Sequence, residues 1–224
     1  MKFFVTGTDT GIGKTYVTVG LLKAFQQHQQ CAIGIKPVAS GCAQVEDRLQ
    51  NEDALALQQA SSILLDYSIV NPIAFAPPIA PHIAAQQVNF HLTAHVIQQA
   101  IQPALAQPAD VYIFEGAGGW LMPLNQQETW ANFVSANSFK VIVVVGMRLG
   151  CLNHALLTMH ALRSANISIA GWVANCIDPH MLNLEENLIT LDNFLDIPRL
   201  GVIQFQQAPE AGLDISSLIE SALY

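Results

Sequence analysis

The chain has 224 residues, of which 51% are hydrophobic and only 12% are charged. Its formal net charge is −8 with nine lysine and arginine residues, which excludes a nucleic-acid partner held by its phosphate backbone. No apolar run approaches the roughly 20 residues of a membrane span, and the N-terminus lacks the pattern of a signal peptide.

The cysteine pattern predicts the cellular compartment. No Cys-x-x-Cys pair occurs, which disfavours structural zinc and a disulfide framework. The four cysteines are Cys31, Cys42, Cys151 and Cys176. Reduced thiols are typical of the cytoplasm, so we expect a soluble, cytoplasmic protein. The low charge predicts that a second copy of the chain covers part of the surface. The length allows a single domain over residues 1–224.

Apolar runs alternate with amphipathic stretches along the chain. Six runs are continuous, as expected of parallel strands buried on both faces. These predicted strands are residues 2–6, 31–36, 110–115, 140–145, 168–175 and 199–203. The predicted helices are residues 14–28, 92–106, 129–137, 152–165, 181–195 and 214–223. The proline-rich stretch 71–87 is predicted as an extended loop. The alternation predicts an α/β fold with three α/β/α layers and a mostly parallel central sheet, which collects ligands at its strand carboxyl ends.

The first predicted strand leads into the loop GTDTGIGKT, residues 7–15, and a predicted helix follows. This is the setting of a phosphate loop, in which backbone N–H groups and a helix N-terminus bind an anion. The first glycine lies one residue earlier than in the usual G-x-x-x-x-G-K-[ST] spacing, but Gly11 and Gly13 still permit close backbone approach. Lys14 supplies charge for a phosphate and Thr15 a hydroxyl for Mg²⁺. The loop therefore predicts a P-loop NTPase-like fold.

Charged residues near other strand ends are candidates for the same site. Glu115 ends a predicted strand, where a carboxylate would hold nucleotide-bound Mg²⁺, or would pair with a lysine. Asp53 could be a second carboxylate or a helix N-terminal residue, and Asp9 a ligand or a turn former. Lys36 follows a strand and precedes a proline, which suits stabilisation of a transferring phosphoryl group, with a solvated strand-end lysine as the alternative.

Two further patterns are less specific. His91 and His95 have the spacing of helical metal ligands, but without a third ligand the pattern favours a polar helix face. The stretch GMRLGCLNHA, residues 146–155, is typical of a strand end, a turn and a helix start. Free N–H groups at that start could bind a carboxylate, or Asn153 could cap the helix.

Taken together, these motifs resemble the dethiobiotin synthetase family. The resemblance runs from the first strand to about residue 176 and is carried by several stretches. These are VTGTDTGIGKT, IKPVASG, NEDALALQ, VNPIAFAPPIAPHIAA, FEGAGGWLMPL, VVVGMRLGCLNHALLT and GWVANC. The long spacing in the phosphate loop is the form that this family uses.

The resemblance implies an ATP-dependent ligase of biotin biosynthesis. One amine of 7,8-diaminononanoate takes up CO₂ as a carbamate, whose oxygen attacks the γ-phosphate of ATP. The product is a carbamic-phosphoric anhydride. The second amine then closes the ring of dethiobiotin and expels phosphate, leaving ADP. The co-substrate is ATP and the implied cofactor is Mg²⁺.

The resemblance also implies roles for individual residues. Lys14 and Lys36 hold the γ-phosphate and the carbamate, while Thr10 and Ser40 donate hydrogen bonds beside them. Lys36, Lys14 and Thr10 are thus the catalytic set. The implied Mg²⁺ ligands are Thr15, Asp53 and Glu115. The implied ATP contacts are Gly11, Ile12, Gly13, Lys14, Thr15, Tyr16, Asp53, Glu115, Gly116, Ala117, Gly118, Asn175, Cys176, Gln204 and Glu210, with Asn175 reading the adenine edge.

A homodimer with its active site at the interface follows from the resemblance as well. The helix start that takes the substrate carboxylate across that interface comprises Gly150, Cys151, Leu152 and Asn153. The chain departs from the family pattern at three places. Gly11 stands where some relatives have an acidic residue, Arg148 where a lysine is familiar, and Gln204 where a proline is expected.

The main alternative is a ParA/MinD-like ATPase switch, which partitions DNA or positions a septum. Those switches carry an additional lysine in the phosphate loop, and Asp9 occupies its place here. The chain also lacks a basic patch for DNA and a basic C-terminal helix for membranes. A small-molecule kinase would leave FEGAGGW and LGCLNHA unexplained.

Overall fold

A computed structural model describes residues 1–220, and its main sheet has six parallel strands within that range. They are β1 (Lys2–Gly7), β2 (Ala32–Ile35), β7 (Val111–Glu115), β8 (Lys140–Met147), β9 (Ile169–Cys176) and β10 (Arg199–Ile203). Their spatial order is β10-β9-β8-β1-β7-β2, so β1 lies inside the sheet and β10 at an edge. All six predicted strands are confirmed. Residues 141–147 of β8 are all buried, which explains the continuous apolar pattern.

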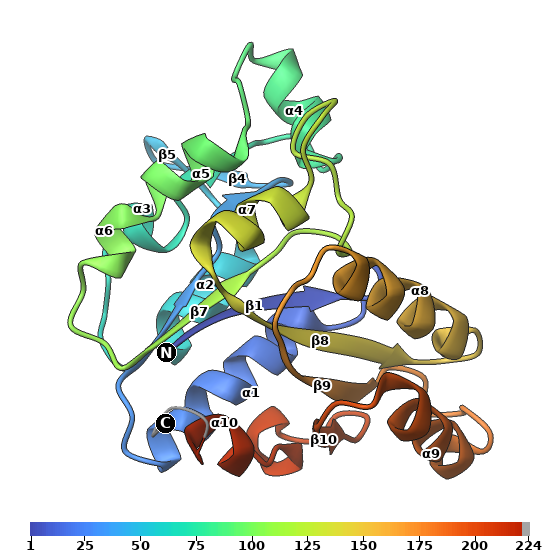
Figure 1. Ribbon diagram of the computed structural model, residues 1–224. Coiled ribbons are helices and arrows are strands. Elements are labelled where there is room, and N and C mark those ends of the chain that lie inside the picture. The colour runs from blue at the N-terminus through green and yellow to red at the C-terminus, as the bar shows by residue number, and fades with distance from the viewer. Residues whose placement is uncertain (221–224) are drawn as a thin grey trace.

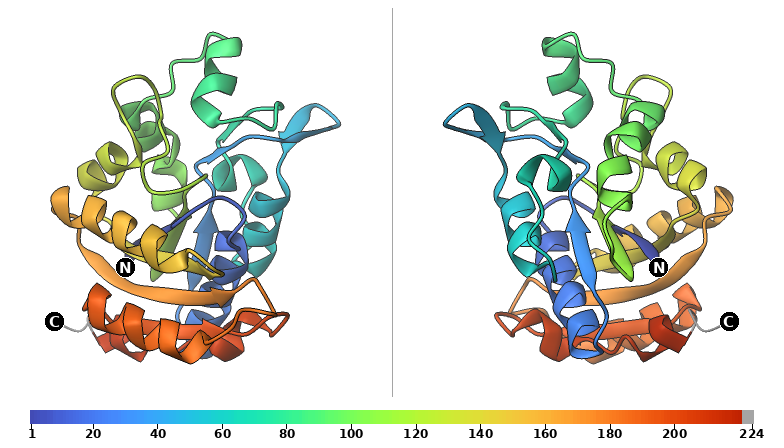
Figure 2. Two further views of the ribbon diagram at one scale, coloured as in Figure 1. Left: turned by 90° about the vertical axis from the view of Figure 1, so that its right-hand side faces the viewer. Right: turned by 90° about the vertical axis from the view of Figure 1, so that its left-hand side faces the viewer.

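Helices cover both faces of this sheet (Figure 1, Figure 2). On one side lie α1 (Lys14–Gln27) and α2 (Glu52–Ala60), and on the other side lie α7 (Trp130–Asn137) and α8 (Cys151–Ser164). The crossover from β9 to β10 contains α9 (Leu184–Leu195), which packs against α8. The predicted three-layer α/β/α fold is therefore confirmed. Within residues 1–220, no helix is both long enough and apolar enough to cross a membrane.

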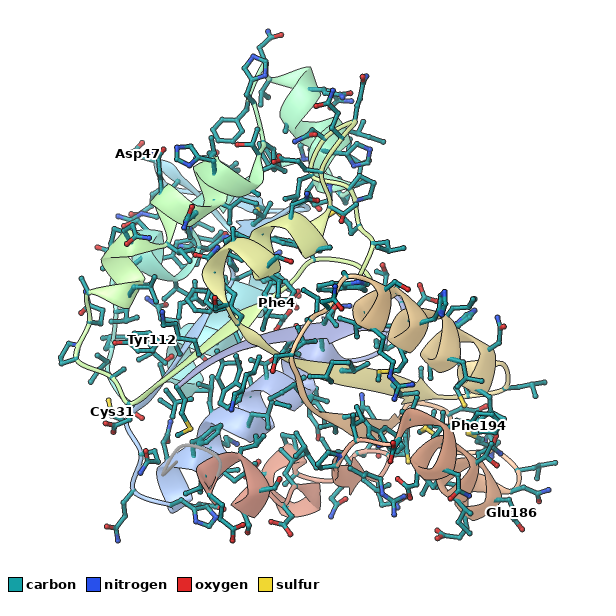
Figure 3. The ribbon with its side chains drawn as sticks, in the orientation of Figure 1. Phe4, Cys31, Asp47, Tyr112, Glu186 and Phe194 are labelled. Atoms are coloured by element: carbon teal, nitrogen blue, oxygen red, sulfur yellow. The ribbon has the colours of Figure 1, made fainter. Side chains whose placement is uncertain are left out.

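Aromatic packing holds the central strand in place. Phe4 of β1 is completely buried, and Figure 3 shows it beneath α7. Its ring centroid lies 5.3 Å from that of Trp130 and 6.0 Å from that of Phe133, both on α7. Burying one such ring stabilises the fold by about 1.5–3 kcal/mol. This packing fixes β1, and with it the loop that follows β1.

The helix predicted at 92–106 is wrong in one respect, because the segment forms two helices. They are α5 (Ala94–Ala100) and α6 (Gln102–Leu105). Pro103 causes the break, since its ring would clash with the carbonyl of Gln99 and it has no N–H to donate. The other predicted helices are found with shifted ends. The last of them is α10 (Ser216–Glu220), and residues 221–223 of that prediction lie outside the described residues.

The extended loop predicted at 71–87 is also wrong. It contains β6 (Ile73–Ala74), paired with β3 (Val38–Ala39), and then α4 (Pro81–Gln87). Pro81 stands in the first turn of α4, where a missing N–H costs nothing. The remaining short elements are α3 (Tyr67–Val70), the hairpin β4 (Ala43–Val45) and β5 (Arg48–Gln50), and the 3₁₀ helix η1 (Pro209–Gly212). Of these, α3 lies beside the carboxyl end of β2, where the carbonyl of Val70 accepts from the N–H of Lys36, whereas η1 packs against α1 and β10.

Candidate active site

The phosphate loop joins the central strand β1 to α1, which begins at Lys14. Gly11 and Gly13 have φ angles of 71° and 81°, in the left-handed region that favours glycine. A Cβ on Gly13 would lie 2.2 Å from Nδ2 of Asn175, so a side chain there would clash. No side chain caps the N-terminus of α1, and its first N–H groups therefore remain available for an anion.

A cluster of charged side chains lies beside this loop. Lys36, just after β2, donates through Nζ to Oε1 of Glu115, the last residue of β7, and to Oδ2 of Asp53 at 3.0 Å. Thr15, in the first turn of α1, donates to the same Glu115 oxygen at 2.8 Å. Lys14 reaches back to the carbonyl of Asp9 at 2.8 Å. Four elements thus bring two cations, two carboxylates and a hydroxyl together.

Burial of this cluster settles several alternatives. Lys36 is only 4% exposed, so the interpretation as a solvated strand-end lysine is wrong. Glu115 does pair with a lysine, and it is completely buried. Asp53 lies in the first turn of α2, as predicted for a helix N-terminal residue, and its carboxylate also contacts Lys36. Asp9 forms the turn: Oδ1 accepts from the N–H of Thr10 at 2.7 Å, and Oδ2 accepts from Arg148 at 2.6 Å.

The electrostatic environment differs between the two lysines. Burial, together with the nearby Lys36 ammonium, lowers the pKa of Lys14 from 10.5 to about 8. Burial alone would also lower the pKa of Lys36, but the adjoining Glu115 and Asp53 carboxylates raise it above its ordinary value. Burial would raise the pKa of Asp53, and the ammonium of Lys36 outweighs it and lowers that pKa. Lys36 therefore stays charged where Lys14 can lose its proton.

These residues line a cavity of about 440 Å³ at the carboxyl ends of the strands. Its walls include most of the predicted phosphate, metal and substrate residues. They are Thr10, Gly11, Gly13, Lys14, Thr15, Lys36, Ser40, Asp53, Glu115, Ala117 and Gly118. Ala39 and Asn51 also line it and were missed from the sequence. Asn51 is the N-cap of α2, and an asparagine before two acidic residues is a signal that could have identified it.

Residues predicted to contact the rest of the nucleotide lie outside this lining. Asn175 is buried and donates to the carbonyl of Ile12 at 2.8 Å, so its amide packs on the phosphate loop. The hydroxyl of Tyr16 donates to the carbonyl of Gln207. Gln204 is exposed on the same loop, and Glu210 pairs with Lys23 at 3.4 Å. Gly116 directly follows β7, and Cys176 is the last residue of β9.

The start of α8 has the predicted form of a strand end, a turn and a helix. Gly150 is the N-cap with φ 92°, and Cys151 is buried beneath the first turn. The alternative that Asn153 caps this helix is wrong, because no side chain makes the capping hydrogen bond. Leu152 packs against the core, whereas the adjoining Leu149 is 97% exposed. This helix start does not line the phosphate-loop cavity.

Comparison with solved structures shows the fold. The cell division protein FtsY of Thermotoga maritima aligns with a TM-score of 0.55 at 16% identity, covering 100% of this chain and 68% of that one. MinD in the MinC:MinD complex of Aquifex aeolicus gives 0.51 at 13% identity, with 96% and 87% covered. At this level of identity, the similarity shows that the chains share the P-loop fold and shows no more than that.

Sequence comparison is far more specific. A family model described as an AAA domain matches residues 1–211. The ATP-dependent dethiobiotin synthetase of Nitrosospira multiformis is 48% identical, with 98% of this chain and 95% of that protein covered. The protein of the same name from Pseudoalteromonas translucida is 47% identical, with 93% and 92% covered. Because this similarity spans nearly the full length of both chains, the chain belongs to the ATP-dependent dethiobiotin synthetase family.

Proposed function

We propose that the chain carboxylates 7,8-diaminononanoate with CO₂ and closes the ring to dethiobiotin, converting ATP to ADP and phosphate. A single P-loop domain over residues 1–224 would carry this reaction. The observation that supports it most is the convergence of Lys14, Lys36, Glu115 and Asp53 in one cavity beside the phosphate loop. Phosphoryl transfer depends on alignment and charge stabilisation, which such a cluster provides.

The residues act in sequence along the reaction. One amine of the substrate attacks CO₂ and loses a proton to give a carbamate. A carbamate oxygen attacks the γ-phosphorus while ADP leaves, and Lys14 and Lys36 neutralise the charge on the transferring oxygens. Thr10 and Ser40 donate hydrogen bonds that orient the carbamate. The second amine then attacks the carbamate carbon, and phosphate leaves as the ring closes.

A divalent cation fits the donor set beside the phosphate loop. Oε2 of Glu115 is buried and has no hydrogen-bond partner within residues 1–220. Thr15, Asp53 and Glu115 offer one hydroxyl and two carboxylates, the hard oxygen ligands that suit Mg²⁺ held jointly with nucleotide phosphates. When bound, Mg²⁺ would neutralise charge on the β- and γ-phosphates. Lys36 already occupies Oε1 of Glu115, which fixes the orientation of that carboxylate.

The remaining proposed nucleotide contacts run from the first turn of α1 outward to the end of β9. Backbone N–H groups from Gly11 to Tyr16 would bind the phosphates, and the turn at Gly116, Ala117 and Gly118 would pass beside them. The adenine would lie near Asn175 and Cys176 at the end of β9. Gln204 and Glu210 are the outermost of these proposed contacts.

We further propose a homodimer in which the partner's Gly150–Asn153 turn takes the substrate carboxylate. Three exposed leucines support it. Leu149, which adjoins that turn, is 97% exposed, and Leu121 and Leu157, which line one surface pocket together, are 58% and 61% exposed. Such an apolar group is typical of an interface core. Leu157→Arg should convert a dimer to a monomer in analytical ultracentrifugation, whereas Leu182→Arg, at an 84% exposed leucine elsewhere, should not. A wild-type monomer would refute this part of the proposal.

The cytoplasm is the proposed location, which agrees with the four free thiols at Cys31, Cys42, Cys151 and Cys176.

A coupled assay for ADP with ATP, Mg²⁺, bicarbonate and 7,8-diaminononanoate tests the reaction. We expect ADP release that requires both the diamine and CO₂. Mass spectrometry should detect a product heavier than the diamine by one carbonyl and lighter by two hydrogens. ATP hydrolysis that is indifferent to the diamine would instead favour the ATPase switch.

A further inference from the structure

A buried segment behind the cavity holds the backbone of Lys36 from both sides. The N–H of Lys36 donates to the carbonyl of Val70 at 2.8 Å. The carbonyl of Lys36 accepts from Nδ2 of Asn71 at 2.7 Å, and the same amide group donates to the carbonyl of Ile73 at 3.2 Å. Both contacts come from the end of α3 and the residue after it. The position of Lys36 is therefore set by a segment that does not itself line the cavity.

The hydroxyl of Tyr67 connects this segment to the opposite wall. It donates to Oδ1 of Asn71 at 3.0 Å and accepts from the N–H of Asn51 at 2.8 Å. Asn51 caps α2, the helix that carries Asp53, and its amide also donates to the carbonyl of Ser40 at 3.4 Å. One hydroxyl thus joins the strand end that carries Lys36 to the helix start that carries Asp53.

Burial makes this connection rigid. Tyr67 is 7% exposed and Asn71 is 4% exposed. Breaking the chain of hydrogen bonds would leave buried donors and acceptors unsatisfied, which costs more than each bond contributes when formed. Burial also raises the pKa of Tyr67, so its hydroxyl keeps the proton that it donates to Asn71. The network consequently favours one distance between Nζ of Lys36 and Oδ2 of Asp53, which is 3.0 Å.

We propose that Tyr67 and Asn71 are positioning residues that hold the Lys36 ammonium at a fixed position relative to the Asp53 carboxylate for phosphoryl transfer. This inference rests on the proposed function. Neither side chain reaches the cavity, so their effect passes through Lys36 and through the cap of α2. A displacement of about 1 Å in a catalytic group can lower the rate about 100-fold, whereas ground-state binding of ATP depends mainly on the phosphate loop.

The first test is Tyr67→Phe, which removes only the hydroxyl. We expect kcat to fall at least about tenfold while KM for ATP stays within about twofold, as misplacement of a transition-state contact predicts. Rates are normalised to the fraction of protein that binds nucleotide, so that loss of folded protein does not count. The matched control is Tyr112→Phe. That hydroxyl donates to the carbonyl of Gln107 at 2.6 Å, and Figure 3 shows Tyr112 at the far end of β7, on the side of Cys31.

A second measurement does not depend on turnover. The chain has five lysines, and ¹⁵N labelling of their ammonium groups allows that of Lys36 to be identified by its loss in Lys36→Met. We expect Tyr67→Phe to shift this signal or broaden it, and Tyr112→Phe to leave it in place. If Tyr67→Phe fails to fold, Asn71→Ala should produce the same two changes.

The outcomes separate this inference from the proposed function. A Lys36 signal and a kcat that match the wild type in a folded Tyr67→Phe protein would overturn it. So would an equal loss of kcat in Tyr112→Phe. If the wild type lacked turnover, the proposed function would fail, and the ammonium signal alone would then decide whether Tyr67 positions Lys36.

Discussion

Lys36 and Gln204 both follow strands of the same sheet, yet the structure holds them very differently. Lys36 follows β2, is buried, and bonds through its side chain to Glu115 at the end of the neighbouring β7. Gln204 follows β10, at the opposite edge of the sheet from β2, and is exposed. Residues that follow strands are thus not equivalent. Both strands lie at edges of the sheet, so the difference comes from what surrounds each strand end. Lys36 is buried and its ammonium pairs with Glu115 and Asp53, whereas Gln204 is exposed on a loop.

The largest effect is expected from Lys36→Ala. We expect turnover to fall by about 100- to 1,000-fold, because a charge aimed at the transferring phosphoryl group is lost. The substitution also leaves the buried carboxylate of Glu115 without its lysine partner, which should lower the free energy of unfolding by about 3–5 kcal/mol. The coupled ADP assay and urea unfolding measure the two effects.

The control is Lys23→Ala, which removes a lysine from the half-exposed pair with Glu210. It should leave turnover within about twofold, as expected for a surface ion pair. Retention of more than about a tenth of wild-type turnover in Lys36→Ala would break the contrast between the two regions.

Glu115→Gln should mainly change the metal requirement. The amide keeps the shape of the side chain but loses the charge that faces Lys36 and Thr15. We expect the Mg²⁺ concentration for half-maximal turnover to rise about tenfold or more at fixed ATP. The same substitution at Glu128, which accepts from the N–H of Ala94 at 3.1 Å, should leave it unchanged. An unaltered Mg²⁺ titration for Glu115→Gln would remove this residue from the metal site.

The pH dependence should reveal the lowered pKa of Lys14, about 8. Only the protonated amine binds phosphate, so above that pH the free protein must take up a proton when ATP binds. We expect kcat/KM for ATP to fall by up to about tenfold per pH unit above pH 8. Lys14→Arg should remove this decline, because arginine stays charged. A decline that persists in Lys14→Arg would assign it to another group.

The same shift affects folding with the opposite sign. Between about pH 8 and 10.5 the unfolded chain keeps a proton on Lys14 that the folded chain has lost. Through this group the stability therefore rises as the pH increases across that window, and falls again as the pH drops toward 8.

The smallest effect is expected from Gln204→Ala. On an exposed loop a single hydrogen bond to the nucleotide should change KM for ATP by about two- to threefold. A rise of tenfold or more would mean that ATP orders this loop, and the contrast with Lys36 would then hold only for the free protein.

Much of the fold was predictable because its signals are local. The six strands were read from continuous apolar runs, and the phosphate loop from a strand, glycines and a helix in one short stretch. Lys36 and Glu115 could be selected as candidates because they follow strands. The break at Pro103 and the start of α4 at Pro81 carry equally local signals, and reading them more closely would have corrected both predictions.

The sequence by itself determined which residues could bind phosphate, because glycine flexibility, helix starts and strand burial depend on neighbours along the chain. Only the tertiary structure decided which of them meet. Lys36 and Glu115 are 79 residues apart, and they touch because β2 and β7 are adjacent in a parallel sheet. Tyr67 acquires its role in the same way, since its hydroxyl bonds to Asn51 and Asn71 only after α3 packs behind the cavity. Such pairings follow from strand order and burial, which no local pattern encodes.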